Sequence, residues 1–199
     1  MKKILKRAYG QYYKAINFYY CIVSGLKYNP TFKIRGKLIL KKASYYQKSG
    51  TLIIGDHFKA NSKTGSNSLG VIQPVIINIS SPDSKIIIGN NVGISGSTLN
   101  ARISITIGNN VMIGSGCIIT DTDSHSLDYR FRDDPDKVKS KPITISDNVF
   151  IGARTLIMKG VNIGEGAVIG AGSVIIKDIP PFTVFAGNPA VYIKNINLD

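Results

Sequence analysis

The stretch ISDNVF IGARTL IMKGVN IGEGAV IGAGSV IIKDIP, residues 145–180, repeats every six residues and decides the fold. Isoleucine opens every hexad, and glycine or another small or polar residue usually follows it. An amphipathic helix would return its apolar residues at spacings of three and four, so this period excludes a helix. Short β segments rich in Ile and Val, joined by tight turns at every sixth residue, fit the pattern.

The same period occurs upstream, where hexads start at Ile88, Ile94, Ile107 and Ile113. One residue too many lies between Ile94 and Ile107, which predicts a bulge or slip within 100–103. A single segment cannot bury its own isoleucine, so stacked coils must build the core together. The sequence therefore predicts an all-β solenoid, a parallel β-helix with three hexads per coil. The fifth register should line the same core, with Val92, Thr98, Val111, Cys117, Val149, Thr155, Val161, Ala167 and Ser173.

The rhythm stops after Ile119 and resumes at Ile145, and the interruption contains TDTDSHSLD. This segment, residues 120–144, is predicted to protrude as a loop, the place where a solenoid can carry a reactive group. It holds His125, one of only two histidines in the chain. An imidazole, with an ordinary pKa of about 6.5, suits a general base at neutral pH. The alternative is a solvated loop histidine.

The net charge of +13 belongs to one end of the chain. Residues 1–50 contain twelve Lys or Arg and no Asp or Glu, whereas the remainder is nearly neutral. Residues 1–28 can be drawn as a helix that either caps the open end of the β-helix or lies on an anionic membrane surface. No known motif accompanies the charge, which disfavours nucleic acid. The helix would place these residues near one side: Ile4, Leu5, Ala8, Tyr12, Ala15, Ile16, Tyr19 and Val23.

The start of the chain lacks the clean apolar core and small-residue cleavage site of a signal peptide. No apolar stretch approaches the roughly 20 residues that span a bilayer. The cysteines, Cys21 and Cys117, form no metal or redox spacing. These features predict a cytoplasmic protein, with an inner-membrane surface as an additional location.

The hexads, the interruption DTDSHSLD, the restart at 141–181 and the closing FAGNPAVYIK resemble the hexapeptide-repeat acyltransferases. Within that family the chain is similar to the maltose, galactoside and capsular-polysaccharide O-acetyltransferase branch, over residues 85–195 and more loosely over 50–84. The resemblance implies a left-handed β-helix, a homotrimer with active sites between subunits, acetyl-CoA as donor, no metal, and a sugar or surface-polysaccharide hydroxyl as acceptor.

The resemblance also assigns residues. His125 matches the catalytic histidine, and Asn100 would line the acceptor site. From their position beside the histidine, Asp121 and Asp123 could orient the imidazole or contact the sugar, or simply keep the loop soluble. The coenzyme would contact Gly152, Ala153, Gly170 and Ala171 along the coils, with Lys177 and Lys194 near its phosphates. The glycines and alanines are also what the repeat itself requires, and the lysines could be ordinary exposed charges.

Three organisational units follow: an N-terminal segment at 1–45, the acyltransferase β-helix at 46–182, and a tail at 183–199. N-acetylation of an amino sugar would use the same base, so the acceptor atom stays open. A non-catalytic scaffold would need neither His125 nor a coenzyme groove. The zinc carbonic anhydrases that share this fold use three histidine ligands, more than this chain contains.

Overall fold

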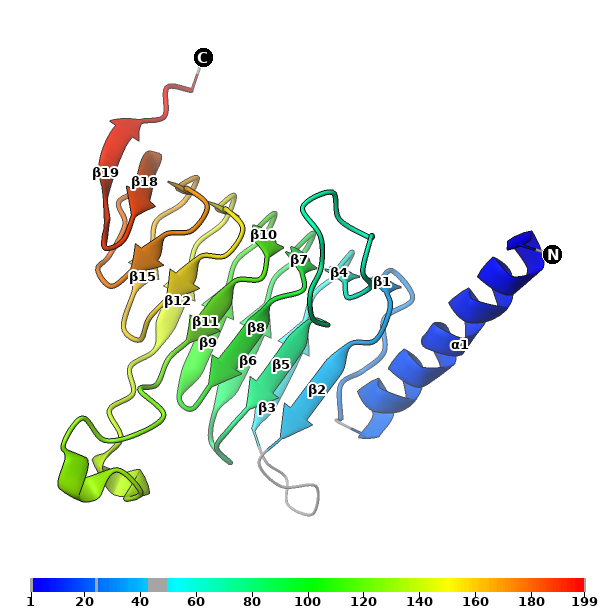
Figure 1. The fold of residues 1–199 in the computed structure, drawn as a ribbon, viewed down its shortest axis with the longest axis horizontal. Coiled ribbons are helices and arrows are strands. Elements are labelled where there is room, and N and C mark those ends of the chain that lie inside the picture. The colour runs from blue at the N-terminus through cyan, green and yellow to red at the C-terminus, as the bar shows by residue number, and fades with distance from the viewer. Residues whose placement is uncertain (1, 24, 43–49, 199) are drawn as a thin grey trace.

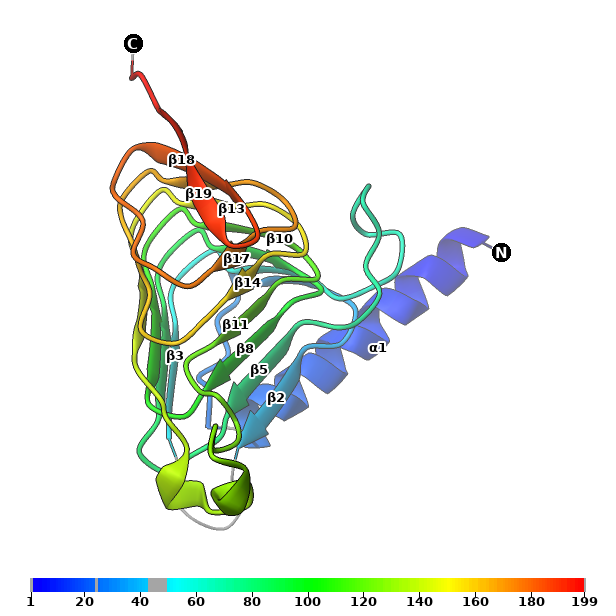
Figure 2. The same cartoon turned by 60° about the vertical axis from the view of Figure 1, so that its left-hand side comes forward.

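The computed structural model describes residues 2–23, 25–42 and 50–198. Short strands wind around one axis and build three sheets, here named A, B and C, in which neighbouring strands run parallel except for the last pair of sheet A (Figures 1 and 2). Successive strands along the chain join sheet A, then B, then C, so three strands complete one coil of a prism. This arrangement confirms the predicted coil of three hexads and fits the left-handed β-helix that the resemblance implies.

The strands of each sheet stack in the order of the coils. Sheet A contains β1 (Lys33–Arg35), β4 (Lys59–Asn61), β7 (Gly93–Ser95), β10 (Met112–Ser115), β13 (Phe150–Ile151), β16 (Val168–Ile169), β18 (Thr183–Gly187) and β19 (Ala190–Asn195). Sheet B contains β2 (Ile39–Lys42), β5 (Ile76–Ile79), β8 (Thr98–Ala101), β11 (Ile118–Thr120), β14 (Leu156–Ile157) and β17 (Val174–Ile175). Sheet C contains β3 (Thr51–Ile54), β6 (Lys85–Ile88), β9 (Ser104–Ile107), β12 (Ile143–Ile145) and β15 (Asn162–Ile163).

The isoleucine columns form the core of the prism. Ile113 pairs with Ile151 in sheet A, and Ile107 pairs with Ile145 in sheet C. Burying an isoleucine side chain stabilises the fold by about 1.5–3 kcal/mol, so one column along a sheet supplies a large share of the stability. The fifth-register residues lie beside these columns and are also buried: Val92, Val111, Cys117, Val149, Thr155, Val161, Ala167 and Ser173.

The predicted slip between Ile94 and Ile107 has two parts. The coil is one residue short between Ile94 and Leu99, because Ser95 pairs with Ser115 across a bulge. Between Leu99 and Ile107 it is two residues longer than a hexad, and Arg102 and Ile103 form the corner between sheets B and C there. The prediction of Thr98 as a core residue is therefore wrong. Ser97 is buried in its place, and Thr98 lies on the outer face of β8.

Helix α1 (Lys2–Val23) lies at the N-terminal end of the coils, next to β1 and β2 (Figure 1). Asn17, which is 2% exposed, joins the two parts. Its side-chain amide donates to the Gly36 carbonyl at 2.9 Å, and its Oδ1 accepts from the Leu38 N–H at 2.9 Å. Cys21 is fully buried in the same contact. These contacts make α1 the cover of the first coil. No described helix is long and apolar enough to cross a membrane.

The two ends of the prism differ from the predicted boundaries. The boundary at residues 45 and 46 lies outside the described residues, and β1 and β2 already belong to the sheets before it. At the other end the predicted tail forms the antiparallel pair β18 and β19, which closes the edge of sheet A. An antiparallel hairpin of this kind blunts a sheet edge that would otherwise offer unpaired backbone groups.

Candidate active site

The interruption of the repeat leaves the prism at the corner between β11 of sheet B and β12 of sheet C (Figure 2). At the base of this loop, the outgoing and returning chain segments are joined by an isolated antiparallel bridge between Thr122 and Ser140. The Ser140 hydroxyl donates to Thr122 Oγ1 at 2.9 Å, and the Asp123 N–H donates to the Lys139 carbonyl at 3.0 Å. This closed neck holds the loop in one position relative to the wall.

His125 lies just beyond the neck with an exposed side chain. The preceding residue, Ser124, has a φ of 64°, which turns the chain sharply at this point. His125 Nδ1 lies 3.1 Å from the Arg132 carbonyl oxygen. A carbonyl oxygen only accepts, so a hydrogen bond here requires the proton of the neutral ring on Nδ1. The other ring nitrogen, Nε2, is then the basic one.

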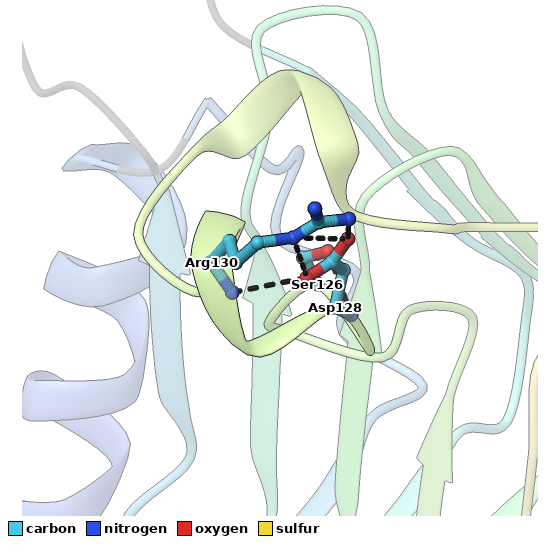
Figure 3. A network of polar contacts seen from close by, with 3 residues as sticks. All are labelled: Ser126, Asp128 and Arg130. Atoms are coloured by element: carbon cyan, nitrogen blue, oxygen red, sulfur yellow. Dashed lines mark hydrogen bonds and ion pairs between the residues drawn. The ribbon is translucent and has the colours of Figure 1, made fainter.

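A polar network supports the far side of the loop (Figure 3). The Asp128 carboxylate caps the short helix at Tyr129–Phe131 by accepting from the Arg130 N–H at 3.0 Å. It also forms an ion pair with the Arg130 guanidinium at 2.6 Å. These bonds hold the pKa of the Asp128 carboxyl below its usual range, chiefly through the Arg130 side chain. Ser126 accepts from the Asp128 N–H at 3.2 Å, which links the network to the segment that carries His125.

Asp121, predicted to orient the histidine or contact the sugar, is fully buried. Its two carboxylate oxygens each accept a backbone N–H at 2.7 Å, from Arg102 and from Ile103. These are the residues of the enlarged corner between β8 and β9. The carboxylate therefore closes that corner, and its burial does not fit the predicted contact with the sugar. Burial raises the pKa of Asp121, although the backbone hydrogen bonds partly oppose this effect.

We expect Asp121→Asn to lower the free energy of unfolding by about 1–3 kcal/mol at pH 7, because an amide NH₂ would face one of the two N–H donors. The raised pKa means that the folded chain keeps a proton on Asp121 that the unfolded chain has released. Wild-type stability from this group is lost as the pH rises through the folded-state pKa. The difference in the free energy of unfolding between wild type and Asp121→Asn should thus grow as the pH falls toward about 4, the pKa of an aspartate in the unfolded chain.

Urea unfolding of both proteins between pH 4 and 8 measures this difference. Asp133→Asn, an exposed change in the same loop, is the matched control and should shift neither the midpoint nor its pH dependence. Equal stability of wild type and Asp121→Asn would contradict the corner role and restore a role in the sugar site.

Asp123 pairs with a residue that the sequence did not suggest. Its carboxylate contacts the Lys159 ammonium in an ion pair with side chains only 9% and 24% exposed. Within the described residues its Oδ2 is buried without a hydrogen-bond partner. Lys159 belongs to the corner after β14, on the next coil, so the pair ties the base of the loop to the wall. No described contact joins Asp123 or Asp121 to the His125 ring, whose partner is the Arg132 carbonyl.

A cleft of about 380 Å³ on the outer face of sheet B begins beside the histidine loop. We name it the sheet-B cleft; Lys41, Ile76, Asn78, Thr98, Asn100, Ile118, Thr120 and Ser124 line it. Asn78 donates to Asn100 Oδ1 at 2.7 Å, and Asn100 donates to Thr120 Oγ1 at 3.1 Å. Asn100 thus lines a cleft that reaches Ser124, the residue next to His125, and its role in the acceptor site stays a prediction.

A second cleft, of about 490 Å³, lies at the corner between sheets A and B. We name it the corner cleft; Leu69, Gly70, Ile72, Ser115, Gly116, Ala153, Arg154, Ala171 and Gly172 line it. Two residues predicted to contact the coenzyme, Ala153 and Ala171, lie here together. The segment with Leu69 and Ile72 was missed, although it falls in the long gap without hexads between 61 and 76. Both side chains are largely exposed above the cleft.

The glycines predicted beside the coenzyme have no room for a side chain, because neighbouring strands pack directly against them. A Cβ on Gly152 would lie 2.5 Å from the Ala171 nitrogen, and one on Gly170 would lie 2.7 Å from the Ala186 Cβ. The Gly152 N–H donates to the Ile169 carbonyl at 2.8 Å, so this amide is used between coils. In contrast, among the backbone hydrogen bonds of the described residues, the Ala153 N–H donates to none.

The two predicted phosphate-binding lysines lie outside the corner cleft. Lys177 follows β17 at the corner of sheets B and C, and Lys194 lies on β19, paired with Val184 in sheet A. Both side chains are exposed. The structure therefore brings Ala153 and Ala171 together but places each lysine on a different face of the C-terminal coils.

The histidine loop and the corner cleft occupy different corners of one prism. The loop leaves between sheets B and C, whereas Ala153 lies between β13 of sheet A and β14 of sheet B. The full width of sheet B separates the two corners. A reaction that used both His125 and the corner cleft would therefore join groups from two neighbouring prisms.

Comparisons with known proteins agree with the repeat. Residues 142–177 match the family described as hexapeptide repeat of succinyl-transferase. The galactoside O-acetyltransferase of Escherichia coli (strain K12) is 44% identical over 94 residues, which cover 47% of this chain and 45% of that protein. The chain thus spans about half the length of such curated relatives.

Two solved structures resemble about three quarters of this chain. A galactoside acetyltransferase in complex with coenzyme A has a TM-score of 0.57 and 34% identity, over 74% of this chain and 65% of that one. A hexapeptide-repeat acetyltransferase from Vibrio cholerae, complexed with acetyl coenzyme A, has a TM-score of 0.54 and 29% identity, over 74% and 70%. In sequence and in fold this chain therefore resembles the hexapeptide-repeat acetyltransferases, with the galactoside O-acetyltransferases among them.

Proposed function

We propose that this protein transfers an acetyl group from acetyl-CoA to a sugar hydroxyl, with His125 as the general base. One observation carries the proposal: the Arg132 carbonyl lies within hydrogen-bond distance of Nδ1, which leaves Nε2 as the basic nitrogen of an exposed ring. Ser124, the residue before His125, lines the sheet-B cleft, whose amides and hydroxyls suit the hydroxyl groups of a sugar.

The reaction needs a base and an oxyanion donor. His125 Nε2 takes the proton of the sugar hydroxyl while its oxygen attacks the thioester carbonyl carbon. The Ala153 N–H, which has no acceptor among the described residues, donates to the oxyanion that forms. The C–S bond then breaks, the acetyl group stays on the sugar oxygen, and the coenzyme thiolate takes the proton from the imidazolium. The histidine returns to its neutral state.

The separation of the two corners favours a trimer with shared sites. Three prisms packed around an axis would place the histidine loop of one subunit against the corner cleft of the next, in a closed assembly. The coenzyme would lie along Gly152, Ala153, Gly170 and Ala171, with Lys177 and Lys194 near its phosphates. Because Lys177 lies at the corner between sheets B and C, it would reach this coenzyme from the neighbouring subunit, as His125 would. The acceptor we propose is a sugar of a surface polysaccharide or its precursor.

The test is release of coenzyme A from acetyl-CoA in the presence of a panel of neutral sugars, amino sugars and short glycans. We expect acceptor-dependent release, and Ala153→Leu should raise the KM for acetyl-CoA about 10–100-fold because the larger side chain fills the corner cleft. Ala15→Leu, the same change on the exposed face of α1, is the control and should leave the KM unchanged.

Each outcome of this assay decides between functions. If the product is acetylated on an amino group, the acceptor is an amine and not a hydroxyl, and the proposed base stays the same. Calorimetry that detects no binding of acetyl-CoA or coenzyme A would overturn the enzyme proposal and favour the non-catalytic scaffold.

A further inference from the structure

Helix α1 turns its apolar side away from the protein. The described helix residues that are buried against the prism are Asn17 and Cys21, which are polar or small. The large apolar side chains lie on the opposite side and are exposed, with Tyr12 at 58%, Tyr19 at 62% and Ile22 at 58%. Ala8, Ala15, Phe18 and Val23 are exposed with them. Five members of the stripe that the sequence placed on one side of this helix therefore face outward, namely Ala8, Tyr12, Ala15, Tyr19 and Val23, and Ile16 is half-buried.

The cleft next to this helix is positively charged. Lys14 of α1, Lys33 and Arg35 of β1, and Lys59 of β4 line a hollow of about 620 Å³ beside the helix. Among the described residues none of these four cations forms an ion pair. The first acidic residue of the chain is Asp56, so the helix and its surroundings carry charge of one sign.

We infer that α1 and its flanking cations form a docking surface for an anionic membrane. An interfacial helix buries an apolar face at the level of the lipid headgroups and places cations among them. Lysines and arginines near an anionic bilayer each contribute about fivefold to binding. A helix that exposes a stripe of aromatic and branched side chains and also borders an unneutralised cationic cleft meets both requirements, and neither the helix nor the lining of the cleft contains an acid that would repel the lipid phosphates.

The Asn17 contacts make this surface a rigid one. The helix is held to Gly36 and Leu38 by two buried hydrogen bonds, so its outward face is fixed relative to the coils. Docking through that face would hold the whole prism at the membrane. This inference does not rest on acetyl transfer, because membrane binding is measured without acetyl-CoA or a sugar.

Cosedimentation of the full chain with vesicles tests the inference. Vesicles of phosphatidylcholine with 30% phosphatidylglycerol should bind the protein at least tenfold more strongly than pure phosphatidylcholine, and added salt should weaken this binding. Tyr19→Ser with Ile22→Ser should reduce binding at least tenfold. Lys33→Gln with Lys59→Gln should reduce it roughly 30-fold, from about fivefold for each cation removed.

Matched changes elsewhere control for general effects on the protein. Ile53→Ser with Ile176→Ser removes apolar side chains that are 52% and 53% exposed on other faces. Lys85→Gln with Lys137→Gln removes two exposed cations there. Both pairs should leave vesicle binding within about twofold of wild type. Thermal unfolding and the protection of the Cys21 thiol report whether α1 keeps its place in each variant, because burial raises the pKa of that thiol to about 11.

Two results would overturn the inference. One is equal binding of the wild-type protein to neutral and anionic vesicles, or to neither. The other is a change in oligomeric state, seen by sedimentation in the absence of lipid, when Tyr19 and Ile22 are replaced while vesicle binding stays at the control level. That result would assign the apolar stripe to a second copy of this chain.

Discussion

His125→Asn should lower the rate of acetyl transfer by about 10²–10⁴-fold and leave coenzyme binding unchanged. A positioned base contributes a factor of this size to proton removal, and an amide side chain cannot take the proton. Coenzyme binding should survive because His125 is not part of the corner cleft, where Ala153 and Ala171 lie. The measurement is kcat with the best acceptor, together with calorimetric titration of coenzyme A.

The second histidine of the chain supplies a matched control. His57 lies exposed in the turn between β3 and β4 with a φ of 60°, a conformation that asparagine tolerates. His57→Asn should therefore keep wild-type kcat. If His125→Asn folds, binds coenzyme A and transfers acetyl groups at the wild-type rate, the base is another residue.

The same variant also tests whether subunits share their sites. With acetyl-CoA held well below the wild-type KM, where each variant alone is nearly inactive, we expect subunits carrying His125→Asn and subunits carrying Ala153→Leu to restore activity when they are mixed and reassembled. In a shared site an intact histidine loop can meet an intact corner cleft from the neighbour, at about a quarter of the sites in random trimers. Activity that stays absent in the mixture would place both groups in the same subunit.

The repeat could be predicted from the sequence because its cause is local. Each hexad places an isoleucine inward and a small residue at the corner, and these choices are visible without knowing which coils are neighbours. The protruding loop could be predicted for the same reason, since Ile119 and Ile145 mark where the rhythm stops and resumes. The exact inward positions failed only around Thr98, where the coil is one residue short and the next corner contains two extra residues.

The roles of the acidic residues could not be predicted because they depend on stacking. Asp121 and Asp123 are two positions apart beside the histidine, and no sequence pattern distinguishes their roles. In the structure Asp121 meets the corner of the previous coil, at Arg102 and Ile103, and Asp123 meets Lys159 of the next coil. These contacts depend on which residues of neighbouring coils lie side by side. The repeat pattern does not show this for residues outside the hexads.

The direction of α1 illustrates the same limit. Its apolar stripe was visible as a helical pattern, and the expected use of such a stripe is to cover a core. The structure instead seats the helix through Asn17 and Cys21. Periodicity predicts that a helix has an apolar side and a polar side, but the surface that it packs against decides which side is buried. Here the open end of the coil offers the backbone groups of Gly36 and Leu38, and a buried amide satisfies them.

Gly152→Ala should lower the free energy of unfolding by about 3 kcal/mol or more, the upper range for overpacking. The new Cβ would lie 2.5 Å from the Ala171 nitrogen and 2.8 Å from the Gly170 carbonyl carbon, both of which are backbone atoms of the next coil. Separating the coils at this corner would strain the Gly152 N–H bond to the Ile169 carbonyl. For a chain of this length we expect the midpoint of thermal unfolding to fall by roughly 6–12 °C.

Gly93→Ala is the matched control for this prediction. Gly93 lies on β7 of the same sheet, a Cβ there would meet no atom within 4 Å, and its φ is not in the left-handed region. Alanine should leave stability unchanged or raise it by up to about 1 kcal/mol, since it restricts the unfolded chain. If Gly152→Ala were as stable as Gly93→Ala but bound coenzyme A more weakly, the glycine would serve the coenzyme. A loss of stability without coenzyme present would instead assign it to the wall, against which any bound coenzyme must lie.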